Sequence, residues 1–144
     1  MAFVGNLLWF IFGGGLLSCI LWFLTGCVMF LSIVGIPFAF AAWRIAGFAA
    51  FPFGKELVDV RLLNESRVPG TALGNFLWII LAGLWLAIAH AVAGVAECVT
   101  IIGIPFGLAH FKLAVVCFAP LGKKAVPVEV AAAARMRHAQ AQLS

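Results

Sequence analysis

Charge is what this chain has least of. Asp, Glu, Lys and Arg make up 10% of its 144 residues, against about 25% in a typical soluble domain. No charged residue precedes Arg44, and none lies between Arg67 and Glu97. Each gap is longer than the roughly 20 apolar residues that span the hydrocarbon core of a bilayer. With a mean hydropathy of +1.18, the composition excludes a soluble globular domain and predicts an integral membrane protein.

Signatures of catalysis and of export are also missing. The chain has no paired carboxylates and no nucleophile elbow, and its triple glycine at 13–15 is not followed by the Lys-Ser/Thr of a phosphate-binding loop. The stretch before Cys19 loosely resembles a lipoprotein cleavage site, but residues 1–18 contain no Lys or Arg, which a signal peptide requires. We expect neither an enzyme nor a cleaved leader.

Cysteine is present but not in the patterns that bind metals. The chain has four, none of them in a Cys-x-x-Cys pair and all in apolar surroundings: Cys19, Cys27, Cys98 and Cys117. This spacing indicates neither a zinc site nor a disulfide framework. We therefore expect no metal and no cofactor, and we expect the cysteines to pack as small apolar residues.

The cations that are present gather in two clusters and give a net charge of +4. The clusters are Lys55, Arg61 and Arg67 in the middle, and Lys123, Lys124, Arg135 and Arg137 near the end. Because each cluster follows an apolar block, the positive-inside rule places both at the cytoplasmic face. Membrane topology thus accounts for the charge, and no nucleic-acid partner is expected.

An internal repeat organises the chain. Gly5-Asn6-x-Leu8-Trp9 matches Gly74-Asn75-x-Leu77-Trp78, and, after a one-residue gap, Gly35-Ile36-Pro37-Phe38 matches Gly103-Ile104-Pro105-Phe106. Arg44 then aligns with Lys112. We divide the chain into a first membrane repeat (residues 1–54), a cytoplasmic linker (55–73), a second membrane repeat (74–122) and a cytoplasmic tail (123–144).

Each repeat is an apolar block of about 50 residues, and two divisions of it are open. In the preferred one the turn lies near residues 25–27, between helices 5–24 and 27–50, and the second repeat turns near 91–94. In the other, the chain breaks at Gly-Ile-Pro and leaves a half-helix of about 15 residues between Pro37 and Pro52, which is too short to span.

Both divisions return the chain to the side from which it started. The predicted fold is therefore an all-α, multi-pass membrane protein made of two parallel helical-hairpin repeats, with second helices broken at Gly-Ile-Pro. A pseudo-twofold axis along the membrane normal would relate the repeats, and both termini would be cytoplasmic.

The polar linker and tail carry a weaker pattern. Val58, Val60 and Leu62 alternate with charged residues, and Val126, Val128 and Val130 share that period of two, which indicates short strands. We expect the two pieces to pair as a small cytoplasmic ribbon with Pro127 at an edge. The alanine-rich residues 130–144 predict a short helix near anionic lipid.

These motifs resemble a known family. The pattern G-N-x-x-W in each repeat, I-I-G-I-P-x-G-x-A-x-F-K in the second and P-x-G-K after it are similar to the YccF family of bacterial inner-membrane proteins. The resemblance covers nearly the whole chain and is strongest over residues 74–124. It implies a small inner-membrane protein built from two copies of one domain, and it implies no biochemical activity.

The first candidate site combines the repeated prolines and cations. Its residues are Gly35, Pro37 and Arg44, with Gly103, Pro105 and Lys112 in the second repeat. A half-helix that begins at the proline would present unpaired N–H groups and a positive dipole end, and a cation two turns on would favour a small anion. The alternatives are that both cations are anchors that extend to the interface, or that they bind a partner or a lipid headgroup.

Other polar residues have two readings each. His90 and Glu97 are seven apart and form a candidate outer polar site, either an interfacial pair or a proton-coupled or cation-binding site. His110 either lines a cavity or bonds a backbone carbonyl. Asn6 and Asn75 either cap helices or meet at a subunit interface.

Abundant glycine permits close helix packing, and about 100 embedded residues are too few to enclose a pore, so we expect a homo-oligomer in the lipid bilayer. The leading functional expectation is an oligomeric channel or transporter-like protein for a small ion, with an anion as one candidate. The alternative is a non-conducting scaffold or accessory subunit that recruits a protein partner through its linker and tail.

Overall fold

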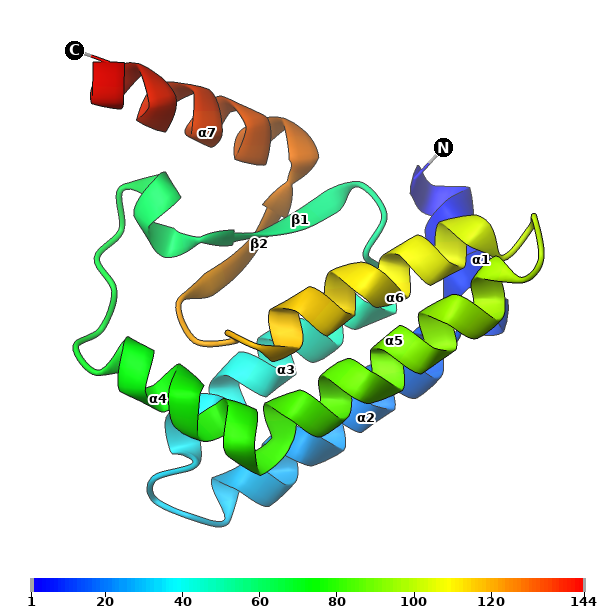
Figure 1. Ribbon diagram of the computed structural model, residues 1–144, viewed down its shortest axis with the longest axis horizontal. Helices are drawn as coiled ribbons and strands as arrows, with labels where there is room; N and C mark the ends of the chain where they lie inside the picture. Colours follow the sequence, from blue (N-terminus) through cyan, green and yellow to red (C-terminus); the bar gives the residue numbers. More distant parts are fainter. Residues whose placement is uncertain (1, 144) are drawn as a thin grey trace.

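The structure is a computed structural model that describes residues 2–143. Helices dominate it, and a short ribbon joins its two halves (Figure 1). The elements of the first half are α1 (Ala2–Phe12), α2 (Gly15–Phe30), α3 (Ile36–Ala50), the strand β1 (Lys55–Asp59) and the 3-10 turn η1 (Val60–Leu63). Those of the second half are α4 (Thr71–Trp78), the π-helical turn η2 (Ile79–Gly83), α5 (Leu84–Cys98), α6 (Ile104–Cys117), the strand β2 (Lys123–Pro127) and α7 (Val128–Leu143).

Two helical hairpins form the apolar part of the molecule. α2 packs along α3, and α5 packs along α6. The chain reverses at residues 31–35 and 99–103, immediately before each Gly-Ile-Pro. The preferred division was therefore wrong, because residues 25–27 and 91–94 lie inside α2 and α5. The alternative half-helix is the one observed, since α3 has 15 residues and is about 22 Å long.

Local chemistry explains why the reversal falls there. The hydroxyl of Ser32 accepts a hydrogen bond from the Gly35 amide at 3.0 Å, and Thr100 does the same for Gly103 at 3.0 Å. A Cβ at either glycine would overlap the carbonyl oxygen of Met29 or Glu97. Proline then fits the first turn of the new helix, where its missing N–H leaves no bond unmade.

The helices that precede the hairpins are bent. α1 and α2 meet at 72° at Gly14, whose φ of +76° suits glycine. At the equivalent place the second repeat has the π turn η2, so α4 and α5 stay continuous. Within residues 2–143, the stretch from Thr71 to Cys98 is the single helix long and apolar enough to cross a membrane, and α1 with α2 passes that test only as a bent pair.

The ribbon between linker and tail confirms the predicted pairing but with shifted bounds. β1 and β2 run antiparallel, with Lys55 opposite Pro127 and Leu57 opposite Ala125. Residues 60–63 form the 3-10 turn instead of continuing the strand, because the Asp59 carboxylate accepts the Arg61 amide and caps that turn. The predicted tail helix is present as α7, which packs on the ribbon.

The two hairpins lie side by side with their turns at opposite ends (Figure 1). Phe38 at the start of α3 stacks on Trp78 of α4, and Phe106 at the start of α6 contacts Trp9 of α1. The hairpins thus run antiparallel, which differs from the predicted arrangement with both turns on one outer side. Each hairpin thus places the start of its second helix against the first helix of the other repeat.

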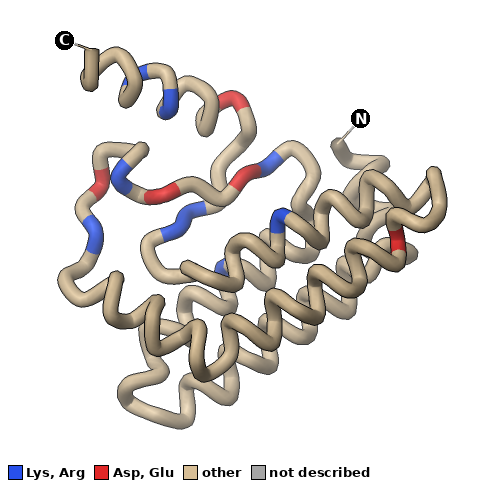
Figure 2. The backbone as a smooth tube through the Cα atoms, in the orientation of Figure 1, with Lys and Arg blue, Asp and Glu red and all other residues tan. Residues whose placement is uncertain are grey.

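Charge and apolar surface are segregated. Charged residues gather on the linker, ribbon and α7, and few interrupt the hairpins (Figure 2). The hairpin turns carry large exposed apolar side chains instead, with Leu31 87%, Ile33 88% and Ile101 87% exposed. An apolar surface of this extent is typical of contact with lipid or with another protein.

Candidate functional site

The candidate ion-site residues occupy equivalent places in the two hairpins but do not converge. Arg44 lies on α3 in a groove with Arg67 of the linker, and Pro37 lines the same groove. Lys112 lies on α6 in a second groove with Glu56 and Lys123. Two separate cationic grooves therefore replace a shared site.

The glycines and prolines of that candidate site have a structural task. The Gly35 and Gly103 amides are bonded to Ser32 and Thr100 in the hairpin turns, so these donors are not free for an anion. What remains of the anion hypothesis is the pair of side chains, Arg44 and Lys112, each facing its own groove.

A chain of polar side chains is buried between the two hairpins. His90 on α5 is 2% exposed and His110 on α6 is 5% exposed. Their Nδ1 atoms lie 3.0 Å apart, and the indole Nε1 of Trp22 on α2 donates to Nε2 of His90 at 3.0 Å. This series of hydrogen-bonded side chains therefore links the first repeat to the second.

The indole sets the direction of the hydrogen bonds. Trp22 can only donate, so Nε2 of His90 must be the acceptor and Nδ1 of the neutral ring must carry the proton. That proton points to Nδ1 of His110, which accepts it and must carry its own proton on Nε2. One combination of tautomers satisfies both contacts. It leaves the Nε2–H group of His110 as the donor at the end of the series farthest from Trp22.

Glu97 lies at that far end. Its Oε1 is 3.8 Å from Nε2 of His110, too far for a direct hydrogen bond. Its Oε2 is buried and has no hydrogen-bond partner among residues 2–143. A carboxylate aligned with a donor and holding an unused buried oxygen is well placed to take up a proton.

Residues of the first repeat cover His110 from one side. The ring of Trp9 packs on His110 with a centroid distance of 4.9 Å. A Cβ on Gly14 would come within 3.2 Å of Nε2 of His110. The bend between α1 and α2 thus covers the second repeat's histidine.

His90 and Glu97 were predicted as one polar site, but His110, which lies between them, was not part of that prediction. The expected turn near 91–94 is absent, so the two residues share a face of α5, and His110 joins them from α6. The repeat offset of 68 places Trp22, Met29 and Ala42 at the positions of His90, Glu97 and His110. The offset offered a signal for this contact, since it aligned His90 with Trp22, and Trp22 is the residue that donates a hydrogen bond to His90.

Asn6 and Asn75 each bond a helix to the loop that follows a hairpin, and we call each pair of bonds an asparagine clasp. The Asn6 amide accepts from the Phe53 N–H at 2.8 Å and donates to the Phe53 carbonyl at 3.0 Å. Asn75 makes the same pair of bonds with Leu121, at 3.0 Å and 3.3 Å. Capping was the wrong reading for Asn75, because Gly70 is the N-cap of α4; the subunit-interface reading stays a prediction.

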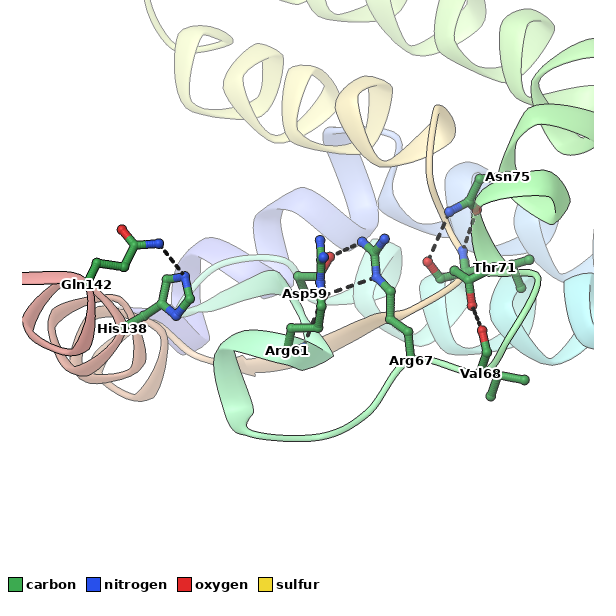
Figure 3. A network of polar contacts seen from close by, with 9 residues as sticks. Asp59, Arg61, Arg67, Val68, Thr71, Asn75, His138 and Gln142 are labelled. Carbon is green, nitrogen blue, oxygen red and sulfur yellow. Dashed lines mark hydrogen bonds and ion pairs between the residues drawn. The ribbon is translucent and has the colours of Figure 1, made fainter.

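A polar network on the linker adjoins the second clasp (Figure 3). Arg61 and Arg67 both bind the carboxylate of Asp59, and Thr71 bonds the Val68 carbonyl at 2.6 Å. Burial alone would raise the pKa of Asp59, but hydrogen bonds from the Arg61 amide and from both guanidinium groups lower it overall. The network holds the linker against the start of α4.

The part of the chain that the structure describes contains no group of three or more His, Cys, Asp or Glu side chains placed to hold a metal ion. All four cysteines are free thiols. The imidazole and carboxylate side chains of the buried chain are groups that can bind and release protons.

Comparisons with known proteins agree with the repeat. Residues 4–55 and 73–123 each match the YccF family, described as an inner membrane component domain. The chain is 36% identical over 146 aligned positions to the inner membrane protein YccF of Escherichia coli (strain K12), and equally to that of Shigella flexneri, with 97% of both chains covered in each case. No solved structure matches the chain. The chain belongs to the YccF family of inner membrane proteins.

Proposed function

We propose that this chain is a transporter-like protein of the inner membrane that binds a proton at the buried chain of Trp22, His90, His110 and Glu97. The single observation that carries the proposal is that chain, because ionisable side chains buried in an apolar membrane domain are costly and usually functional. The proposal narrows the expected small ion to a proton.

Embedding of the hairpins in lipid is part of the proposal. Backbone groups in hydrocarbon must be satisfied within the protein, and the turn at 31–35 satisfies three of its five amides. The amides of Leu31, Ser32 and Gly35 bond to carbonyls three residues back, and the Ser32 hydroxyl bonds the Met29 carbonyl at 3.3 Å. Thr100 makes the same bond to the Glu97 carbonyl at 3.3 Å.

The hydrogen-bond directions specify where a proton can bind. A proton added to His110 would place two N–H groups face to face at the 3.0 Å contact with His90. Reversing the His90 tautomer would move the conflict to Trp22. A proton added to Glu97 breaks neither contact, so the carboxylate takes the first proton. A further proton on either histidine would break one of the hydrogen bonds among Trp22, His90 and His110.

This arrangement favours a carrier over a channel. The chain of bonds ends at an indole N–H, which does not ionise, so it offers no continuous path for protons. A binding site whose hydrogen bonds break when a further proton binds fits a carrier that alternates between two conformations. The small embedded mass and the large exposed apolar side chains of the hairpins support assembly into a homo-oligomer.

Proton movement in liposomes tests the proposal. The purified protein, reconstituted with a pH-sensitive dye inside, is expected to carry protons down an imposed pH gradient faster than protein-free liposomes. Glu97→Gln and His110→Gln should reduce that rate at least tenfold. His138→Gln is the matched control, because His138 is exposed on α7 and contacts Gln142. A rate equal to that of empty liposomes, or one unchanged by Glu97→Gln in a folded protein, would refute it.

A second candidate function is a membrane scaffold, and the segregation of charge favours it. β1, β2 and α7 form a polar platform in which Arg135 of α7 binds Glu56 of β1. A scaffold that recruits a partner here would lose it when the chain is cut after residue 127, whereas proton movement would persist. The two candidates are therefore separable in one truncated protein.

A further inference from the structure

We propose that the groove beside Arg44 binds the headgroup and the upper acyl chains of an anionic phospholipid. The groove has a volume of about 520 Å³ and lies between α3, α4 and the linker. It is separate from the buried histidine chain, and the proposal goes beyond proton binding.

The groove has a cationic and an apolar half. Arg44 and Arg67 line it together with the hydroxyl-bearing Ser66 of the linker. Toward the hairpin turn its wall is made of large apolar side chains that are exposed in this chain: Val34, Phe40, Leu73 and Leu77. A phospholipid has the same order of a charged head followed by apolar chains.

The charges in the groove leave room for an anion. Among residues 2–143, no ion pair involves Arg44, and its side chain is exposed. Arg67 shares the Asp59 carboxylate with Arg61, so two guanidinium groups meet one carboxylate and a net positive charge remains beside Arg44. Planar guanidinium groups bind phosphate through paired hydrogen bonds.

The equivalent cation of the second repeat provides the contrast. Lys112 lies in a smaller groove of about 360 Å³ that also contains Glu56. The hydrogen bond from Arg135 lowers the pKa of Glu56, and the positive charge of Lys112 lowers it further. The second groove thus supplies its own anion, and we assign the lipid to the Arg44 groove alone.

Thermal unfolding of the purified protein in a nonionic detergent tests this assignment. Phosphatidylglycerol should raise the unfolding temperature at a concentration about tenfold lower than phosphatidylethanolamine of the same acyl chains. Arg44→Gln should remove this preference, because the unshared guanidinium is lost. Lys112→Gln is the matched control and should retain it.

Two further arms identify the ligand. Inorganic phosphate alone should not reproduce the shift, since it lacks the acyl chains; a shift as large as that from phosphatidylglycerol would overturn the lipid assignment in favour of a free anion. Ser66→Glu places a carboxylate in the groove at an exposed linker position and should weaken phosphatidylglycerol binding severalfold, while Ser66→Gln should not. This pair decides the matter if Arg44→Gln does not fold. Equal responses to the two lipids, or an undiminished preference in Arg44→Gln or Ser66→Glu, would overturn the proposal.

Discussion

Removing the asparagine clasp tests how each hairpin is tied to the helix before it. Asn6→Ala deletes one donor and one acceptor, and both partners are backbone groups of Phe53. Each hydrogen bond contributes about 1 kcal/mol net, so we expect a loss of about 2 kcal/mol. Water reaches the half-buried Asn6 and replaces part of the lost bonding.

Asn75→Ala is the matched change in the second repeat. Asn75 is 8% exposed, so water replaces less of the bonding lost at its own site and we expect the loss of stability to rise toward about 3 kcal/mol. The two clasps share no partner, so the double variant should lose roughly the sum of the single losses.

The assay is unfolding in mixed micelles with increasing denaturing detergent, monitored by tryptophan fluorescence. Gln140→Ala on the exposed face of α7 is the control and should change stability by less than about 0.5 kcal/mol. Losses of that small size in both Asn6→Ala and Asn75→Ala would refute the clasp. A larger loss at Asn6 than at Asn75 would refute the burial argument.

Three further outcomes follow from the structure. Gly47→Ala should stabilise α3 by up to about 1 kcal/mol, because nothing lies within 4 Å of the added Cβ. Gly107→Ala should destabilise the protein by about 1–3 kcal/mol, because its Cβ would overlap Sγ of Cys98. The same unfolding assay compares the two variants. The Arg135 hydrogen bond lowers the pKa of Glu56 below its ordinary value of 4.5, so the docking of α7 on the ribbon should be fully stabilised above pH 4.5 and weaken as the pH falls below it. Hydrogen exchange of α7 at two pH values measures this, and a Glu56→Gln protein with the same pH dependence would contradict it. In a chain whose native cysteines are replaced by serine, Gln140→Cys should react with a membrane-impermeant maleimide in inside-out vesicles, and Ile101→Cys in the hairpin turn should not; rapid reaction at residue 101 would argue against its place in lipid.

Part of the candidate site was predictable because it depends on single residues. A carboxylate and an imidazole seven positions apart in an apolar run indicate one helical face. Their partner His110 lies on another helix, 20 residues from His90 in sequence, and Trp22 lies 68 residues away. No local pattern measures such separations, so the chain of bonds could not be derived before the hairpins were placed.

The hairpin turns show a second limit. Helices that are apolar on every side give no amphipathic period from which their packed face or their ends can be located. Gly26 of the first repeat matches Gly94 of the second. Both glycines suggested turns, yet each lies inside a helix. At Gly94 an added Cβ would approach Phe111 and the Gly107 carbonyl, so this glycine permits close packing of α5 on α6.

By itself the sequence determined the membrane class, the two repeats and the pairing of linker with tail. Each of these depends on composition or on a pattern that recurs along the chain, and neither needs knowledge of contacts. The tertiary structure alone decided that the chain reverses before Gly-Ile-Pro, that the two hairpins run antiparallel, and that a tryptophan of one repeat bonds a histidine of the other. These depend on contacts between residues far apart in the sequence, such as Trp22 with His90 and Phe38 with Trp78, which no local pattern specifies.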